Sequence, residues 1–284
     1  MRRKIIHNGL KLLTGLCAFV ACAILVSIIG YILMRGFSAI NWGFLTEKIS
    51  AVGASGGIFY NIIGTLILLL TALICCTPLA LGLAILHSVY LKNNPLQSKL
   101  SLLLYLINGV PSILFGIIGM VVFIQWLDWG KSWFNGGILL GIMMLPTVTI
   151  TLIERISSIP ERYIESARGL GLGKSHVIRS VILPQSFSGL ITGSLLGLAR
   201  AAGETAPIMF TATIFAGAGI PSGIQENPVL SLPYHIFILA QDSYDPNVKM
   251  NLWGAALILV IIVSILSLIA LPARLRIHEE ANHG

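Results

Sequence analysis

Six apolar runs, each long enough to cross a lipid bilayer, are the feature that most limits how this chain can fold. A helix needs about 20 apolar residues to cross roughly 30 Å of hydrocarbon. The chain is 56% hydrophobic and 10% charged, whereas soluble domains have about 25% charged residues. We therefore expect an all-α, polytopic membrane protein. The predicted helices are residues 12–34, 59–86, 99–126, 137–155, 187–213 and 252–272.

The first apolar run follows a short basic segment, as in a secretory signal peptide. The run is too long for the 7–15 apolar residues of such a peptide, so it predicts a retained signal-anchor helix. We therefore expect two parts. Residues 1–58 form the signal-anchor helix and an outer loop, and residues 59–284 form the core transmembrane domain, which contains a cytoplasmic loop at 156–186.

Basic residues are distributed unevenly between alternate connections. If the N-terminus is cytoplasmic, thirteen Lys and Arg residues lie inside and four lie outside, with Arg200 within a helix. The positive-inside rule then predicts that both termini are cytoplasmic. Because the basic residues are spread over these connections rather than gathered in one patch, the net charge of +7 does not indicate a nucleic-acid partner.

The loop at 156–186 carries the clearest local pattern. Pro160 and Glu161 favour a helix start, and the glycines after Leu170 favour its end. A second short helix is expected from Ser175 to Val181, with Pro184 stopping it. Two amphipathic helices joined by glycines predict a compact knob outside the membrane, in which Ala167 and Gly171 are small enough for another surface to approach closely.

The run GLGLGKS at 169–175 is similar to a phosphate-binding P-loop but fails two requirements. Arg168 stands where the motif needs glycine, and a charged helix precedes the run where the motif needs a strand. We therefore expect no bound nucleotide and no cofactor in this chain. The four cysteines lie in apolar runs without ligand partners at metal-binding spacing, so no metal site is expected either.

The loop resembles that of the binding-protein-dependent permeases of bacterial ABC importers, which carries a Glu-Ala-Ala, Gly, Ile, Leu-Pro pattern. The matching residues are Glu165, Ser166, Ala167, Gly171, Val181, Leu183 and Pro184. Ser166 replaces alanine and Val181 replaces isoleucine. The resemblance implies a type I ABC importer permease fold, in which this loop docks into a separate ATPase subunit. The alternative is an amphipathic loop lying on lipid headgroups.

Two charged residues lie within the predicted helix at 187–213. Arg200 is about 21 Å into this helix, and Glu204 follows four residues later on the same helical face. An intramembrane arginine costs about 2.5–3.5 kcal/mol on insertion scales, so it should face a partner or an aqueous path. Pro207 crowds the carbonyl of Gly203 and predicts a kink there. The pair lies either on a translocation path or in a structural ion pair.

Weaker signals accompany this pair. Asn108 and Gly109 precede Pro111, and we interpret them as packing and kink devices rather than substrate contacts. Between residues 214 and 251, the apolar stretch from Tyr234 to Ala240 is too short to span and is expected to be re-entrant or interfacial.

The segment ARAAGETAP is similar to that of the A-type permease subunit of the phosphate-specific ABC importer. This resemblance implies a phosphate transport subunit of the bacterial inner membrane, with Arg200 and Glu204 on its translocation path. It is not an enzyme, because partner subunits hydrolyse ATP. The implied partners are a paralogous second permease, two ATP-binding subunits, an extracytoplasmic phosphate-binding protein and membrane lipid.

Three alternatives remain. The chain is a permease for another oxyanion or small solute, an intramembrane enzyme, or a stand-alone secondary transporter. An intramembrane enzyme would require clustered nucleophiles on facing helices, and Arg200 with Glu204 is the only charged constellation within the apolar runs. Secondary transporters often contain inverted repeats, and no such repeat is visible in the sequence.

Overall fold

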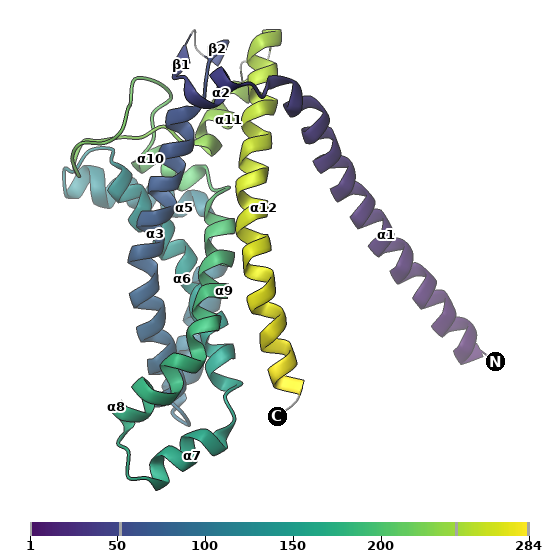
Figure 1. The fold of residues 1–284 in the computed structure, drawn as a ribbon, viewed down its shortest axis with the longest axis vertical. Helices are drawn as coiled ribbons and strands as arrows, with labels where there is room; N and C mark the ends of the chain where they lie inside the picture. Colours follow the sequence, from purple (N-terminus) through teal and green to yellow (C-terminus); the bar gives the residue numbers. More distant parts are fainter. Residues whose placement is uncertain (1, 51–52, 242–243, 283–284) are drawn as a thin grey trace.

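The computed structural model describes residues 2–50, 53–241 and 244–282 of a helical chain (Figure 1). The α-helices are α1 (Arg2–Gly36), α2 (Trp42–Thr46), α3 (Phe59–Ile85), α4 (Pro95–Gly109), α5 (Ser112–Gly119), α6 (Trp133–Ser157), α7 (Glu161–Gly169), α8 (Lys174–Val177), α9 (Leu183–Ala201), α10 (Ala206–Thr211), α11 (Leu232–Gln241) and α12 (Pro246–Asn282). The 3-10 turn is η1 (Phe37–Ala39), and the π-helical turns are η3 (Leu86–Tyr90), η4 (Met120–Trp126) and η5 (Ile178–Ile182). Strands β1 (Ile49–Ser50) and β2 (Ser55–Gly56) form an antiparallel hairpin that pairs Ile49 with Gly56.

The long helices account for the six predicted apolar runs. Five helical spans are long and apolar enough to cross a membrane, and a bent pair of helices brings the total to six. The five spans are Leu10–Ala39, Phe59–Tyr90, Trp133–Ser157, Lys174–Ala201 and Pro246–Ile269. The expected all-α membrane architecture is confirmed.

The predicted single helix at 99–126 is wrong. Helices α4 and α5 meet at Val110 and Pro111 with a bend of 91°. Val110 is extended, with φ −68° and ψ 130°, because the proline ring excludes the α conformation of the preceding residue. The run therefore divides into two helices rather than a kinked one.

The predicted helix at 187–213 is interrupted at the predicted kink near Gly203 and Pro207, and it forms two helices rather than one bent helix. Helix α9 ends at Ala201, and α10 begins at Ala206. Pro207 lies in the first turn of α10, where backbone N–H groups have no acceptor within the helix, so the missing N–H of proline breaks no hydrogen bond. Pro184, expected to stop a helix, instead lies in the first turn of α9, directly after the π-helical turn η5, which widens the helix there.

Glycines bring the central helices close together. Gly189, Gly193 and Gly197 recur every four residues along α9, and a Cβ on any of them would contact α6 at 2.6–3.1 Å. Gly137 and Gly141 play the same part where α6 meets α3. Small residues at this spacing are typical of tightly packed membrane helices, because lipid supplies no hydrophobic force between them. Helices α3, α6 and α9 therefore form the core.

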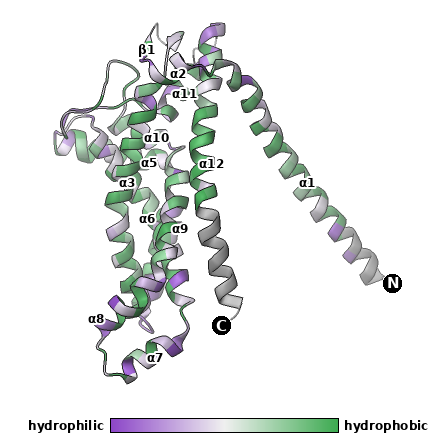
Figure 2. Cartoon of the chain, in the orientation of Figure 1, coloured by the Kyte–Doolittle hydropathy of each residue, from purple (hydrophilic) through white to green (hydrophobic). Residues whose placement is uncertain are grey.

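Helix α1 lies apart from this core. It contacts α12 near Gly36, where a Cβ would lie 2.6 Å from the Trp253 carbonyl, and then diverges toward its N-terminus (Figure 1). None of its apolar span is buried in the chain. Figure 2 shows hydrophobic residues along the described part of this helix. Helix α1 therefore presents apolar surface to lipid or to another protein chain.

The two ends of the bundle differ. Helices α7 and α8 form a knob at one end, which we call the loop end, and both chain termini point toward it (Figure 1). The β-hairpin and α11 lie at the opposite end, the hairpin end. The predicted non-spanning segment Tyr234 to Ala240 belongs to α11. The backbone N–H of Leu232 there donates to Thr65 Oγ1 of α3 at 2.9 Å, so α11 is attached to the core.

Candidate functional site

Arg200 lies in the last turn of α9, about 26 Å along the helix from Leu183. Its side chain is 40% exposed within the chain. A guanidinium at this depth is costly if it faces lipid. Its exposure therefore indicates a surface that meets water or a partner protein in the membrane.

Arg200 bonds to a residue from a distant helix. Its Nη1 donates to Oδ1 of Asn108, in the last turn of α4, at 2.5 Å. Arg200 Nε lies 4.0 Å from Glu204 Oε1, the outer limit of an ion pair. The two residues lie within pairing distance as predicted, but the predicted position of Glu204 on the helix is wrong, because it lies in the break after α9. The stronger contact of Arg200 is therefore with Asn108.

The two helix breaks face each other across this contact. Asn108 adjoins the α4–α5 break, and Arg200 adjoins the α9–α10 break. Helices α5 and α10 pack together beyond it, where a Cβ on Gly116 would lie 2.8 Å from the Ala206 carbonyl oxygen. Interrupted helices at membrane depth occur where the chain lines a cavity or is buried in protein. We call Arg200, Asn108, Glu204 and the two breaks the junction.

The remaining junction residues have distinct positions. The Gly203 N–H donates to the Arg200 carbonyl at 3.2 Å, so Gly203 lies in the turn that closes α9. Glu204 is 19% exposed and lines a cavity of about 10 Å³ against α3 and α6, about the size of one water. Glu204 thus faces the core more than Arg200 does.

The knob at the loop end forms close to its predicted bounds. Helix α7 ends where Gly171, at φ +80°, adopts the left-handed conformation that favours glycine, and its N–H donates to the Arg168 carbonyl at 2.9 Å. Helix α8 then runs through η5 into α9. The knob is thus connected directly to the helix that carries Arg200.

The predicted docking residues divide between two faces of the knob. Those exposed are Glu165, Ser166, Gly171 and Pro184. Ala167 is buried, and Val181 and Leu183 pack against the core, so these three hold the knob to the bundle. The expectation that Ala167 offers close approach to another surface is therefore wrong, since its small side chain meets the core of its own chain.

An ion pair joins the knob to the connection between α3 and α4. Lys92 Nζ lies 3.0 Å from Glu161 Oε1, and both side chains are more than half exposed. This hydrogen bond, together with the charge of Lys92, lowers the pKa of the Glu161 carboxyl. The carboxylate therefore remains ionised at neutral pH. A solvated pair of this kind contributes little to stability.

Sequence reasoning did not assign Asn108 a place in this site. The signal that could have identified it is a polar amide inside an apolar run, since such a group needs a hydrogen-bond partner in the membrane. The partner itself could not be inferred, because it lies 92 residues away. Within the described residues, no group of three or more His, Cys, Asp or Glu side chains could hold a metal ion.

Broken spans near the middle of the membrane occur in membrane transport proteins, where they line the substrate site. The model of the family "Binding-protein-dependent transport system inner membrane component" matches residues 77–275, and the chain belongs to this family. It is thus a multi-pass inner-membrane permease of an ABC importer, in which separate subunits hydrolyse ATP. Membership implies assembly with a second permease, ATPase subunits and a binding protein.

Individual proteins support this assignment. The chain is 28% identical over 281 residues, 95% of each chain, to the "Probable ABC transporter permease protein YqgI" of Bacillus subtilis (strain 168). It is 33% identical over 225 residues to the "Probable phosphate transport system permease protein PstA" of Methanocaldococcus jannaschii, covering 77% of this chain and 75% of that one.

A solved structure has the same fold. A chain in "Inward facing conformations of the MetNI methionine ABC transporter" superposes with a TM-score of 0.58 at 15% identity, covering 78% of this chain and 97% of that one. The type I importer permease fold is confirmed. The family match lies inside the predicted core domain 59–284, and the division at residue 58 stays a prediction.

Proposed function

We propose that this chain forms half of the translocation path of a phosphate importer, with Arg200 contacting the passing anion. The observation that carries the proposal is the half-exposed guanidinium at the junction, held by Asn108 where two spans are broken. A guanidinium presents a planar fork of donors that suits the oxygens of phosphate. Several relatives named as PstA phosphate permeases, at 26–33% identity, support phosphate as the cargo.

The same proposal assigns the partners and the orientation. The second permease is a paralogue that completes the path, two ATP-binding subunits receive the exposed face of the knob, and an extracytoplasmic protein delivers phosphate. This chain needs no cofactor of its own. The distribution of thirteen against four basic residues supports cytoplasmic termini, which would place the loop end on the ATPase side.

The distance between Arg200 and Glu204 favours a role on the translocation path over a structural ion pair. An ion pair that held two helices together would join different helices at close contact, yet Arg200 and Glu204 are 4.0 Å apart and belong to one segment, the end of α9 and the break after it. The helix-to-helix contact is made by the neutral Asn108 instead. Glu204 thus offsets the positive charge of Arg200 only at the outer limit of an ion pair, and the exposed part of the guanidinium can still attract an anion.

The test is uptake of labelled phosphate by proteoliposomes that contain the whole complex and its binding protein. We expect ATP-dependent uptake that excess unlabelled phosphate abolishes and that sulfate or molybdate leaves largely intact. Uptake of sulfate in preference to phosphate would instead favour the second candidate, a permease for another oxyanion, with the same fold and the same role for Arg200.

A further inference from the structure

The exposed side chain of Asn108 uses only its oxygen in the contact with Arg200. Asn108 Oδ1 accepts from Arg200 Nη1 at 2.5 Å. Because a guanidinium only donates hydrogen bonds, the amide atom that faces it must be the oxygen, and this fixes the orientation of the amide. The Nδ2 group, which carries two donor hydrogens, makes no hydrogen bond to any residue that the structure describes. One side of the amide is therefore free to donate to a ligand.

The space beside this contact is open. A Cβ on Gly109, next to Asn108, would meet nothing within 4 Å. A Cβ on Gly203 would meet only the Arg200 carbonyl oxygen, at 3.8 Å. Free donors inside a membrane span are costly against lipid, which offers no acceptor. An acceptor that enters the open space would satisfy the amide.

Covalent geometry keeps the free amide nitrogen close to the guanidinium. Oδ1 and Nδ2 are bonded to the same carbon at about 1.23 and 1.33 Å, so Nδ2 lies at most about 5.1 Å from Arg200 Nη1. An oxygen atom that accepts hydrogen bonds of about 2.9 Å can bridge two nitrogens up to about 5.8 Å apart. A single anion oxygen can therefore reach both side chains.

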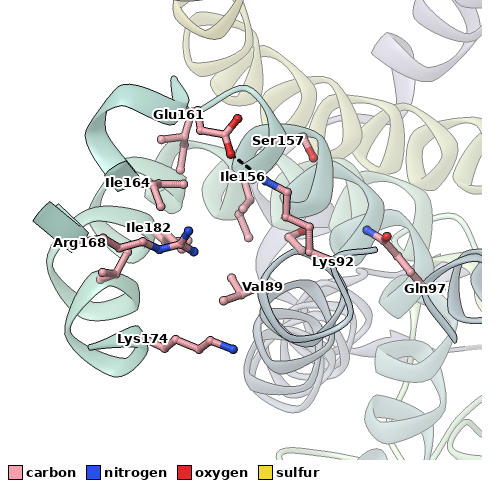
Figure 3. A pocket seen from close by; sticks show the side chains of 13 residues that line it. Val89, Lys92, Gln97, Ile156, Ser157, Glu161, Ile164, Arg168, Lys174 and Ile182 are labelled. Carbon is pink, nitrogen blue, oxygen red and sulfur yellow. Dashed lines mark hydrogen bonds and ion pairs between the residues drawn. The ribbon is translucent and has the colours of Figure 1, made fainter. Parts of the chain in front are cut away.

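The neutral charge of Asn108 distinguishes this contact from the one at the knob. There, Lys92 Nζ lies 3.0 Å from Glu161 Oε1, so a carboxylate offsets the positive charge (Figure 3). Arg200 is held by an uncharged amide, and Glu204 approaches it only to 4.0 Å. A site on a transport path must attract its ion and also release it. One cation with one neutral donor meets both requirements.

We propose that Asn108 is a second ligand for the transported oxyanion, and that its Nδ2 donates to an oxygen that Arg200 also binds. The inference rests on the proposed function, in which Arg200 contacts the anion. The amide then has two roles, since Oδ1 holds the guanidinium and Nδ2 binds the cargo. The packing role that the sequence alone favours for Asn108 accounts only for the contact of Oδ1.

The test measures initial rates of labelled phosphate uptake by proteoliposomes that contain the whole complex and its binding protein. The forms compared are wild type, Asn108→Ala, Asn108→Asp, Arg200→Gln, Arg200→Lys, Arg200→Lys with Asn108→Ala, and Leu106→Ala as a control. Leu106 is exposed on α4 two residues before Asn108, so it points to a different side of the helix. The melting temperature of each complex is measured in the same preparations.

The Arg200→Lys background separates binding of the anion from positioning of the guanidinium. Lysine has no planar fork to orient, so a residue that only positioned the fork would have no effect there. We expect Asn108→Ala to lower uptake by about two- to tenfold in this background, and by at least as much when Arg200 is present. Leu106→Ala should match wild type.

The Asn108→Asp form separates binding of the anion from packing of the two spans. Aspartate keeps an acceptor for Arg200, so the melting temperature should not fall. Uptake should nevertheless be lost, because the carboxylate has no donor and repels the anion.

A loss of uptake confined to the Arg200 background would overturn the inference, because Asn108 would then only position the guanidinium. Wild-type uptake by Asn108→Ala or by Asn108→Asp would also overturn it, and the Asn108→Asp comparison decides if Arg200→Lys alone is inactive. Each of these results leaves the proposed function intact while Arg200→Gln loses uptake. Wild-type uptake by Arg200→Gln would instead refute the proposed role of Arg200 itself.

Discussion

Replacing Gly116 with alanine should separate the two broken spans at the junction. A Cβ at this position would lie 2.8 Å from the Ala206 carbonyl oxygen, 2.8 Å from Phe210 Cδ2 and 3.1 Å from Pro207 Cα. Ordinary contacts between carbon atoms are about 3.5–4.0 Å. Two of these three atoms belong to the backbone of the α10 region and cannot rotate away, so α5 and α10 must move apart.

The cost follows from the size of this overlap. Inserting one methyl group into a well-packed contact costs about 1–3 kcal/mol. That energy corresponds to a roughly 5- to 150-fold shift of the equilibrium away from the packed arrangement. Since Asn108 and Arg200 flank the same contact, their hydrogen bond should be lost in a large fraction of molecules.

The assay is phosphate uptake by the reconstituted complex, measured together with the melting temperature of the complex in detergent. Gly109→Ala is the matched control, because Gly109 belongs to the same bent pair and a Cβ there meets no atom within 4 Å. We expect Gly116→Ala to lower both readouts and Gly109→Ala to leave them near wild type. Equal behaviour of the two variants would refute the argument that α5 and α10 must pack closely.

Other predictions concern the knob and the core. Glu165→Lys and Gly171→Asp should each abolish uptake while membrane insertion, measured by fractionation, stays normal; normal uptake by either variant would count against docking. The ion pair with Lys92 lowers the pKa of Glu161 in the folded protein. The stabilisation of the knob by this pair is therefore complete above the ordinary pKa near 4.5, and it is lost as the pH falls through the lower pKa of the folded state. Hydrogen exchange of α7 should therefore be the same at about pH 8 and pH 6 after correction for intrinsic rates, and faster exchange at pH 6 would contradict this. Gly193→Leu should reduce the yield of folded protein, because α6 lies against Gly193. Gly82→Leu is the control and should leave the yield unchanged, because a Cβ there meets nothing within 4 Å. Similar yields of the two variants would argue against the glycine contact.

The apolar runs and the knob were predictable because their signals are local. Six runs of spanning length, and the glycines that end α7, follow from hydropathy and from helix-end chemistry. The 91° bend between α4 and α5 was not predicted. The sequence is apolar on both sides of the bend, and Pro111 by itself is equally compatible with a modest kink.

The contacts within the site were less predictable. Arg200 stood out as a charge in an apolar run, but its bond to Asn108 depends on how two broken spans meet. The inward direction of Ala167 likewise depends on how the knob packs against the core. Sequence spacing gives the order of residues on one helix and says little about contacts between distant segments.

Phosphate uptake by Arg200→Gln and Arg200→Lys complexes tests the central claim most directly, with assembly and ATP hydrolysis measured in the same preparations. The claim predicts that Arg200→Gln assembles normally and loses uptake, and that Arg200→Lys, which keeps the positive charge without the planar fork, retains part of it. Wild-type uptake by Arg200→Gln would contradict the claim and leave Arg200 as a structural charge.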